Sequence, residues 1–116
     1  MNGASVEIGT RQMADILIVD MAGRLDSSTA GSSYDQLVGI AKGDARKIVL
    51  NLEKLQFISS AGLRAILTMA KLLQSARGEV RICNARAVVK EALETSGFNS
   101  LIRIFDDEKS AIASWD

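Results

Sequence analysis

The sequence predicts an α/β fold with one mixed β-sheet, and three observations indicate it. Short apolar stretches of strand length alternate with stretches whose apolar residues recur at helical spacing, as in mostly parallel sheets with crossover helices. The composition is 47% hydrophobic but only 4% aromatic, so we expect an aliphatic core. The length of 116 residues suits one domain. We therefore predict a single domain over residues 1–116, with about five strands and about four helices in the order β-β-α-β-α-β-α-β-α.

The N-terminal part is expected to form an antiparallel hairpin. Val6 and Ile8 alternate with polar residues in the stretch 5–10, which predicts a half-buried strand. The stretch 14–23 is apolar at nearly every position, as in strands covered on both faces. The short link 11–14 would let these two strands pair.

A loop and a helix should follow the hairpin. Small polar residues cluster over 24–33 and are typical of a loop that leads into a helix cap. A helix over about 30–42 is predicted by four residues at helical spacing, namely Tyr34, Leu37, Val38 and Ala41. Gly43 stands where a C-terminal glycine belongs. The next apolar run, 46–52, predicts a short buried strand.

The second half of the chain repeats the strand and helix alternation. A helix over about 61–76 is predicted by one apolar face made of Leu63, Ile66, Leu67, Ala70 and Leu73. The strand 79–83 should turn Val80 and Ile82 inward and place Glu79, Arg81 and Cys83 on its other face. A helix around Val88 to Leu93 that stops near Gly97, a strand over 101–105 and a short helix over 108–115 complete the predicted order.

Charge and composition exclude several functional classes. Fourteen basic and fourteen acidic residues cancel, so we expect no direct binding of nucleic acid and no attraction to an anionic membrane. No apolar run approaches the ~20 residues of a membrane span, and no signal peptide is apparent, so no membrane insertion is expected. A single cysteine and no histidine suit a reducing, cytoplasmic location.

The residues offer little support for catalysis, a metal site or a cofactor site. Ser59 and Ser60 have no histidine to activate them, no Ser-x-x-Lys pattern follows them, and phosphate-binding glycine motifs are missing. The acidic run Asp106 to Glu108 is interpreted as a cap of the last helix. Cys83 is interpreted as a small buried hydrophobe, and Trp115 as a ring packed at the domain edge. We therefore expect a protein that is not an enzyme and needs no cofactor.

The two serines of the stretch FISSAGLRAIL, residues 57–67, permit two roles. One of them should cap the following helix, which contributes roughly 0.5–2 kcal/mol. A helix N-terminus also tolerates a phosphate, and phosphorylation adds about −1.5 to −2 charge. Such a charge would act on whatever docks against that corner.

Four segments together carry a resemblance to a known family, in order and with matching spacing. They are AGRLDSSTA at 22–30, KIVLNLEKLQFISSAGL at 47–63, GEVRICN at 78–84 and VVKEALETSGFNSLIRIF at 88–105. The chain resembles the anti-sigma factor antagonists, the single-domain STAS proteins of bacterial partner-switching systems. The resemblance implies the STAS fold, a mixed sheet with helices mostly on one side.

The resemblance also implies a regulatory function. In this family the unphosphorylated antagonist binds an anti-sigma factor, often a serine kinase of the histidine-kinase-like ATPase fold, and so frees a sigma factor. The kinase phosphorylates the antagonist on serine and releases it, and a serine phosphatase resets the cycle. The alternative is a non-switching STAS module of a lipid-transport complex or a signalling scaffold, in which the serines would act only as caps.

Alignment on the motif glycine, Gly62, implies that Ser60 is the phosphoacceptor. Many family members carry Asp immediately before the acceptor, whereas this chain has Ser59, which leaves Ser59 as the alternative acceptor. The resemblance places Asp26 close to the acceptor, although capping of the next helix suits Asp26 equally well. The expected partner-binding surface comprises Asp26, Ser27, Ser59, Ser60, Gly62 and Arg64. Arg64 should point away from the apolar face of its helix, toward acidic groups of a partner or toward solvent.

Overall fold

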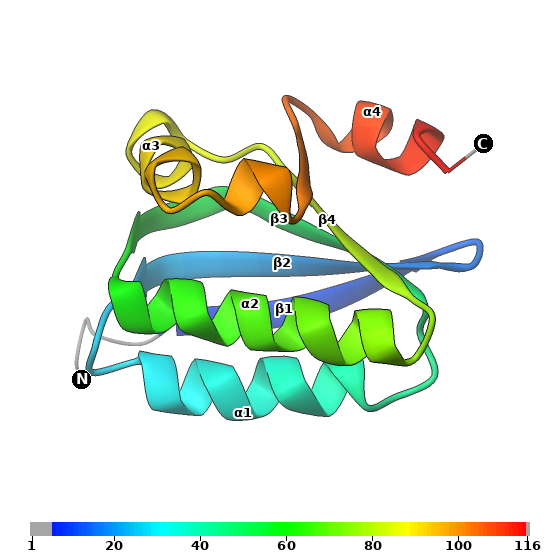
Figure 1. Cartoon of the computed structure of the whole chain (residues 1–116), viewed down its shortest axis with the longest axis horizontal. Coiled ribbons are helices and arrows are strands. Elements are labelled where there is room, and N and C mark those ends of the chain that lie inside the picture. Colours follow the sequence, from blue (N-terminus) through cyan, green and yellow to red (C-terminus); the bar gives the residue numbers. More distant parts are fainter. Residues whose placement is uncertain (1–5, 116) are drawn as a thin grey trace.

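The computed structural model describes residues 6–115, which form a five-stranded mixed sheet with four α-helices (Figure 1). The strands are β1 (Val6–Met13), β2 (Ile16–Leu25), β3 (Lys47–Ile58), β4 (Glu79–Cys83) and β5 (Arg103–Phe105). The helices are α1 (Ala30–Ala41), α2 (Ser60–Ser75), α3 (Ala87–Thr95) and α4 (Glu108–Ala113), with a 3₁₀ turn, η1, at Phe98–Ser100. The predicted fold class and element order are confirmed. No helix within residues 6–115 has the length and apolar character needed to cross a membrane.

The strands lie in chain order, with β1 antiparallel to β2 and all other neighbours parallel. Right-handed crossovers between successive parallel strands place their helices on one face of the sheet. The main core accordingly contains buried residues of α1, α2 and α3, such as Leu37, Ile66 and Leu93, against the inward residues of β2, β3 and β4. In Figure 1, α1 and α2 run side by side, and α4 lies across the strands from them.

The helix α4 covers the opposite face of the sheet at one end. Its Ala111 packs in a second, smaller cluster with Ile16, Ile18, Val49 and Cys83. This explains why β2 is apolar at nearly every position, as predicted, because alternate side chains enter different clusters. The second face is therefore apolar under α4 and polar farther along the strands.

The hairpin is confirmed, but its predicted link over 11–14 is wrong. The strand β1 continues to Met13, which pairs with Ile16, so only Ala14 and Asp15 form the turn. Ala14 has φ 54°, in the left-handed region that tight hairpin turns require. The end of β1 is polar because it lies exposed at the edge of the sheet, and polarity alone suggested a loop. Ser5, the predicted first residue of this strand, lies outside the described residues.

The strand β3 is longer than predicted because it passes through a β-bulge. Asp20 pairs with Asn51, but Ala22 pairs with Lys54, so β3 carries one extra residue there, and a second register shift follows between the pairs Gly23–Leu55 and Arg24–Phe57. The bulge leaves both Glu53 and Lys54 exposed and breaks the expected alternation. The backbone groups of Glu53 have side-chain partners, since its N–H donates to Asn51 Oδ1 at 3.0 Å and its carbonyl accepts from Arg86 Nε at 2.7 Å. The bulge is thus a hydrogen-bonded feature of the strand.

The helix α2 exists as predicted, but its buried face is rotated. Gly62, Ala65 and Met69 are buried together with Ile66 and Leu73. The predicted face members Leu63, Leu67 and Ala70 are only half-buried. Small residues lie at the centre because α2 packs closely against both α1 and the sheet, a constraint that hydrophobicity does not reveal.

The C-terminal elements are shorter than predicted. The strand β5 begins at Arg103, two residues late, because Leu101 follows η1 and is 65% exposed. The helix α4 ends at Ala113, and Trp115 beyond it lies under Arg81, whose guanidinium carbon is 3.9 Å from the ring centroid. Trp115 thus packs at the edge of the domain, as predicted.

Candidate functional site

The predicted site residues come from two segments that the sheet brings together. The strands β2 and β3 run parallel, and their last residues, Leu25 and Ile58, are paired. The N–H of Ser59 then donates to the carbonyl of Leu25 at 2.8 Å. The loop after β2 and the first turn of α2 therefore leave the sheet side by side. We call residues 25–29 and 58–64 the switch corner.

Gly62 permits the close approach of α2 to the switch corner. A Cβ atom on Gly62 would lie 2.6 Å from Leu25 Cγ and 3.0 Å from Ile58 Cγ1, inside van der Waals contact. Leu25 and Ile58 are both buried, so neither is free to move aside. The glycine is therefore required by packing, in addition to any role in binding.

The two serines at the start of α2 have different structural roles. Ser59 is the N-cap residue, and its Oγ accepts a hydrogen bond from the Gly62 N–H at 3.2 Å. Ser60 is the first residue of the helix and is exposed. Among residues 6–115, no hydrogen bond of the Ser60 hydroxyl is found. Capping is thus a property of Ser59, and Ser60 is exposed at the N-terminus of the helix.

Asp26 organises the turn that leads into α1. Its Oδ1 accepts hydrogen bonds from the Ser28 hydroxyl at 2.7 Å, the Ser28 N–H at 3.0 Å and the Thr29 N–H at 3.2 Å. These bonds, that of the Ser28 hydroxyl above all, lower the pKa of the Asp26 carboxyl. The N-cap residue itself is Thr29, which makes no side-chain cap bond. Asp26 therefore stabilises the turn before α1, and these hydrogen bonds fix its carboxylate at the switch corner.

The remaining predicted residues lie exposed at the switch corner. Ser27 is at the tip of the turn, and Arg64 is one helical turn after Ser60 on α2. The sequence interpretation missed Arg24 and Phe57, which pair across β2 and β3 with the guanidinium carbon 4.6 Å from the ring centroid. The sequence contained a signal for Arg24, because the apolar alternation of β2 extends through Leu25 and therefore places Arg24 on the opposite face of the strand.

The other side chains considered from the sequence have structural roles. Asp107 caps α4, with its Oδ1 2.7 Å from the Ser110 N–H, as predicted for the acidic run. Cys83 is fully buried, and burial is the main cause that raises the pKa of its thiol to about 12. Within residues 6–115, no group of three His, Cys, Asp or Glu side chains could hold a metal ion.

Comparisons with known proteins agree with this architecture. The family model of the STAS domain matches residues 7–111. The chain is 34% identical over 100 residues to BtrV of Bordetella bronchiseptica, which is 86% of each chain. It is 32% identical over 109 residues to an anti-sigma F factor antagonist of Paenibacillus polymyxa, which is 93% of each chain. The solved structure of the phosphorylated Bacillus cell fate determinant SpoIIAA superposes with a TM-score of 0.71 at 18% identity, over 95% of this chain and 100% of that one. The chain belongs to the STAS domain family.

Proposed function

We propose that this single-domain protein is an anti-sigma factor antagonist whose binding is switched by phosphorylation of Ser60. Unphosphorylated, it binds an anti-sigma factor that is also a serine kinase of the histidine-kinase-like ATPase fold. Phosphorylation releases the antagonist, and a serine phosphatase restores it. The relative from Paenibacillus polymyxa, named an anti-sigma F factor antagonist, and the phosphorylated form of SpoIIAA both support this role.

The exposure of Ser60 at the first position of α2 carries the proposal. A kinase needs a hydroxyl that it can reach, and Ser60 is exposed while Ser59 is half-buried and engaged as the cap. A phosphate on Ser60 would meet the free N–H groups and the positive end of the helix dipole. The same group would be out of place at the C-terminus of a helix. The fold can therefore hold the modified residue without rearrangement.

The surface that binds the partner is proposed to be the switch corner, with Asp26, Ser27, Ser59, Ser60, Gly62 and Arg64 as the contact residues. Its two segments are held rigidly, since Asp26 is fixed by the turn and Ser59 by the cap and by Leu25. A rigid surface loses little conformational entropy on binding. Arg64 would contact acidic groups of the partner.

One phosphate is sufficient to dissociate such a complex. A new unit charge about 4 Å from a partner carboxylate is repelled by about 4 kcal/mol at an effective dielectric constant of about 20. This corresponds to a loss of affinity of nearly a thousandfold. The switch is thus a change at the interface, with no need for refolding.

Phosphate mapping tests the proposal. The purified protein is incubated with its candidate kinase and ATP, and the modified peptide is identified by mass spectrometry. The variants are Ser60→Ala and Ser59→Asn, because asparagine keeps the N-cap hydrogen bond and removes the hydroxyl. Ser75→Ala, at the exposed far end of α2, serves as the matched control.

Three outcomes are informative. Phosphate on Ser60 that is lost only in Ser60→Ala, with weaker kinase binding after modification, supports the proposal. Phosphate that is lost only in Ser59→Asn would retain the switch and move the acceptor to Ser59. Tight binding to the kinase without any phosphorylation would indicate a non-switching STAS module.

A further inference from the structure

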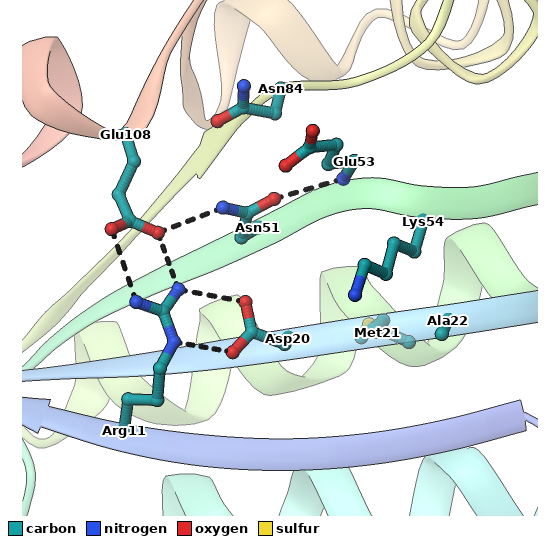
Figure 2. Close-up of a pocket in the computed structure, with 9 residues that line it drawn as sticks. All are labelled: Arg11, Asp20, Met21, Ala22, Asn51, Glu53, Lys54, Asn84 and Glu108. Atoms are coloured by element: carbon teal, nitrogen blue, oxygen red, sulfur yellow. Dashed lines mark hydrogen bonds and ion pairs between the residues drawn. The ribbon is translucent and has the colours of Figure 1, made fainter.

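A second candidate site lies on the opposite face of the sheet, separate from the serines. A cavity of about 500 Å³ opens between the strands and α4, beside the middle of β3 and the carboxyl end of β4 (Figure 2). The cavity is lined mainly by polar side chains, which suits a small polar ligand.

One wall of the cavity is a network of paired charges. Arg11 binds Asp20 through Nε at 2.6 Å and Nη2 at 2.9 Å, and it binds Glu108 through Nη2 at 2.6 Å and Nη1 at 3.3 Å. Asn51 Nδ2 donates to Glu108 Oε1 at 2.8 Å, and Asn51 Oδ1 accepts from the N–H of Glu53 in the β-bulge at 3.0 Å. Both carboxylates share the single guanidinium of Arg11, so this wall shapes the cavity and carries a net formal charge of −1.

The β-bulge supplies the free charges of the cavity. It leaves Glu53 and Lys54, neighbours in the chain, both outside the core, and β-bulges often re-aim side chains beside binding sites. In Figure 2, Lys54 extends toward the side of Asp20, while the Glu53 carboxylate lies on the side of Asn84. Within residues 6–115, neither Glu53 nor Lys54 forms an ion pair. One positive and one negative group are thus available at different sides of the cavity.

Asn84 adds an independent observation. It follows β4 with φ 59°, in the left-handed region that asparagine enters more readily than most residues other than glycine. Its Oδ1 atom is buried and has no hydrogen-bond partner in the described part of the chain. A buried acceptor without a partner is rare in folded proteins and calls for a donor. Rotation of the Asn84 amide toward the cavity would expose this oxygen, and an N–H or ammonium group of a ligand would then provide the donor.

We propose that this cavity binds a small zwitterion of the α-amino acid class. The ligand's ammonium group would be held by the Glu53 carboxylate and Asn84 Oδ1, and its carboxylate by the Lys54 ammonium. With Arg11, Asp20 and Glu108 included, the cavity has a formal charge of about −1, which disfavours a simple anion. Lys54 in turn disfavours a simple cation. A molecule with both charges satisfies both free groups.

Titration followed by nuclear magnetic resonance tests this inference. The full chain is labelled with ¹⁵N and titrated separately with each of the twenty proteinogenic amino acids to about 10 mM, which detects dissociation constants of about 1 mM. We expect one or a few amino acids to cause saturable shifts in the backbone amides of Asn51, Lys54 and Asn84, with the amides of Ser59 and Ser60 unchanged.

Two variants and a control define the contacts. Lys54→Gln removes the cation, and Asn84→Gly removes the amide while keeping a residue that tolerates positive φ. Each should weaken binding by about tenfold or more, since each removes a hydrogen bond to a charged group of the ligand. Lys71→Gln, an exposed lysine on α2, should leave the affinity unchanged. Melting temperatures establish that each variant is folded.

Several results would overturn the inference. One is the lack of any saturable shift with all twenty amino acids, and another is undiminished binding by folded Lys54→Gln. Equal shifts with sodium acetate or ethylammonium chloride would also refute it, because a ligand with one charge would then suffice. Phosphorylation of Ser60 is not involved, so this result is independent of the proposed function.

Discussion

Replacement of Gly62 by alanine tests the packing of the switch corner directly. The new Cβ atom would lie 2.6 Å from Leu25 Cγ and 3.0 Å from both Leu25 Cδ2 and Ile58 Cγ1. Leu25 is 0% exposed and Ile58 is 5% exposed, and Cγ of leucine is the branch point, so the conflict cannot be relieved by rotating a side-chain end. The helix must move away from β2 and β3.

The expected magnitude is the difference between two effects. Overpacking of a buried site costs about 1–3 kcal/mol, and contacts this short favour the upper half of that range. Alanine regains about 1 kcal/mol of helix propensity relative to glycine. The net loss of unfolding free energy is therefore about 1–2 kcal/mol, which lowers the melting temperature by about 4–8 °C.

The assay is urea unfolding with circular dichroism, and Gly39→Ala in α1 is the matched control. A Cβ atom on Gly39 meets nothing within 4 Å, so alanine there should raise the unfolding free energy by about 0.5–1 kcal/mol. The two substitutions thus have opposite expected signs. If Gly62→Ala stabilised the protein as Gly39→Ala does, the close packing of α2 on Leu25 would be refuted.

Three further predictions concern charge and burial. Ser60→Asp should raise the unfolding free energy by about 0.3–1 kcal/mol and Ser75→Asp should lower it by a similar amount, because the two positions lie at opposite ends of the α2 dipole. Thermal melts measure both changes, and a Ser60→Asp variant less stable than the unmodified protein would contradict this reasoning. Glu108→Gln should cost about 1 kcal/mol at pH 7, since Glu108 binds the half-exposed Arg11. The hydrogen bond from Arg11 lowers the pKa of Glu108 below 4.5. The ionised Glu108 carboxylate therefore contributes to the unfolding free energy above about pH 4.5, and this contribution is lost as the pH falls through the pKa of the folded state. Urea midpoints between pH 7 and pH 3 should fall less steeply in Glu108→Gln, and an identical slope would count against the network. Cys83, whose thiol pKa is raised to about 12, should react with a thiol reagent only as fast as the protein opens, and immediate labelling of the native protein would disprove its burial.

The sequence was a good guide to the elements that local patterns determine. Helical spacing placed α1 and α2 within one or two residues, and the capping role of one serine before α2 followed from the residue types alone. The acidic cap of α4 and the burial of Cys83 were also predicted correctly. These features depend on near neighbours in the chain, and so they are visible in a short window.

Features that depend on the partner strand were missed. The polar end of β1 belongs to a strand because β2 supplies its hydrogen bonds, and β3 extends through Glu53 and Lys54 because Asn51 and Arg86 bind the backbone of the bulge. Polarity indicated a link at residues 11–14, and the predicted strand ended with the apolar run at residue 52. The cavity beside α4 was equally hidden, since the chain separation between its residues, such as Arg11 and Glu108, is long.

The sequence by itself determined the order of strands and helices, the aliphatic core and the position of the serines at a helix start, because periodicity and capping are local properties. Only the tertiary structure decided which serine is the cap, how tightly Gly62 packs on Leu25, and that a backbone hydrogen bond joins Ser59 to Leu25. The physical reason is that close packing and strand pairing join residues far apart in the chain, and their distances follow from the whole sheet.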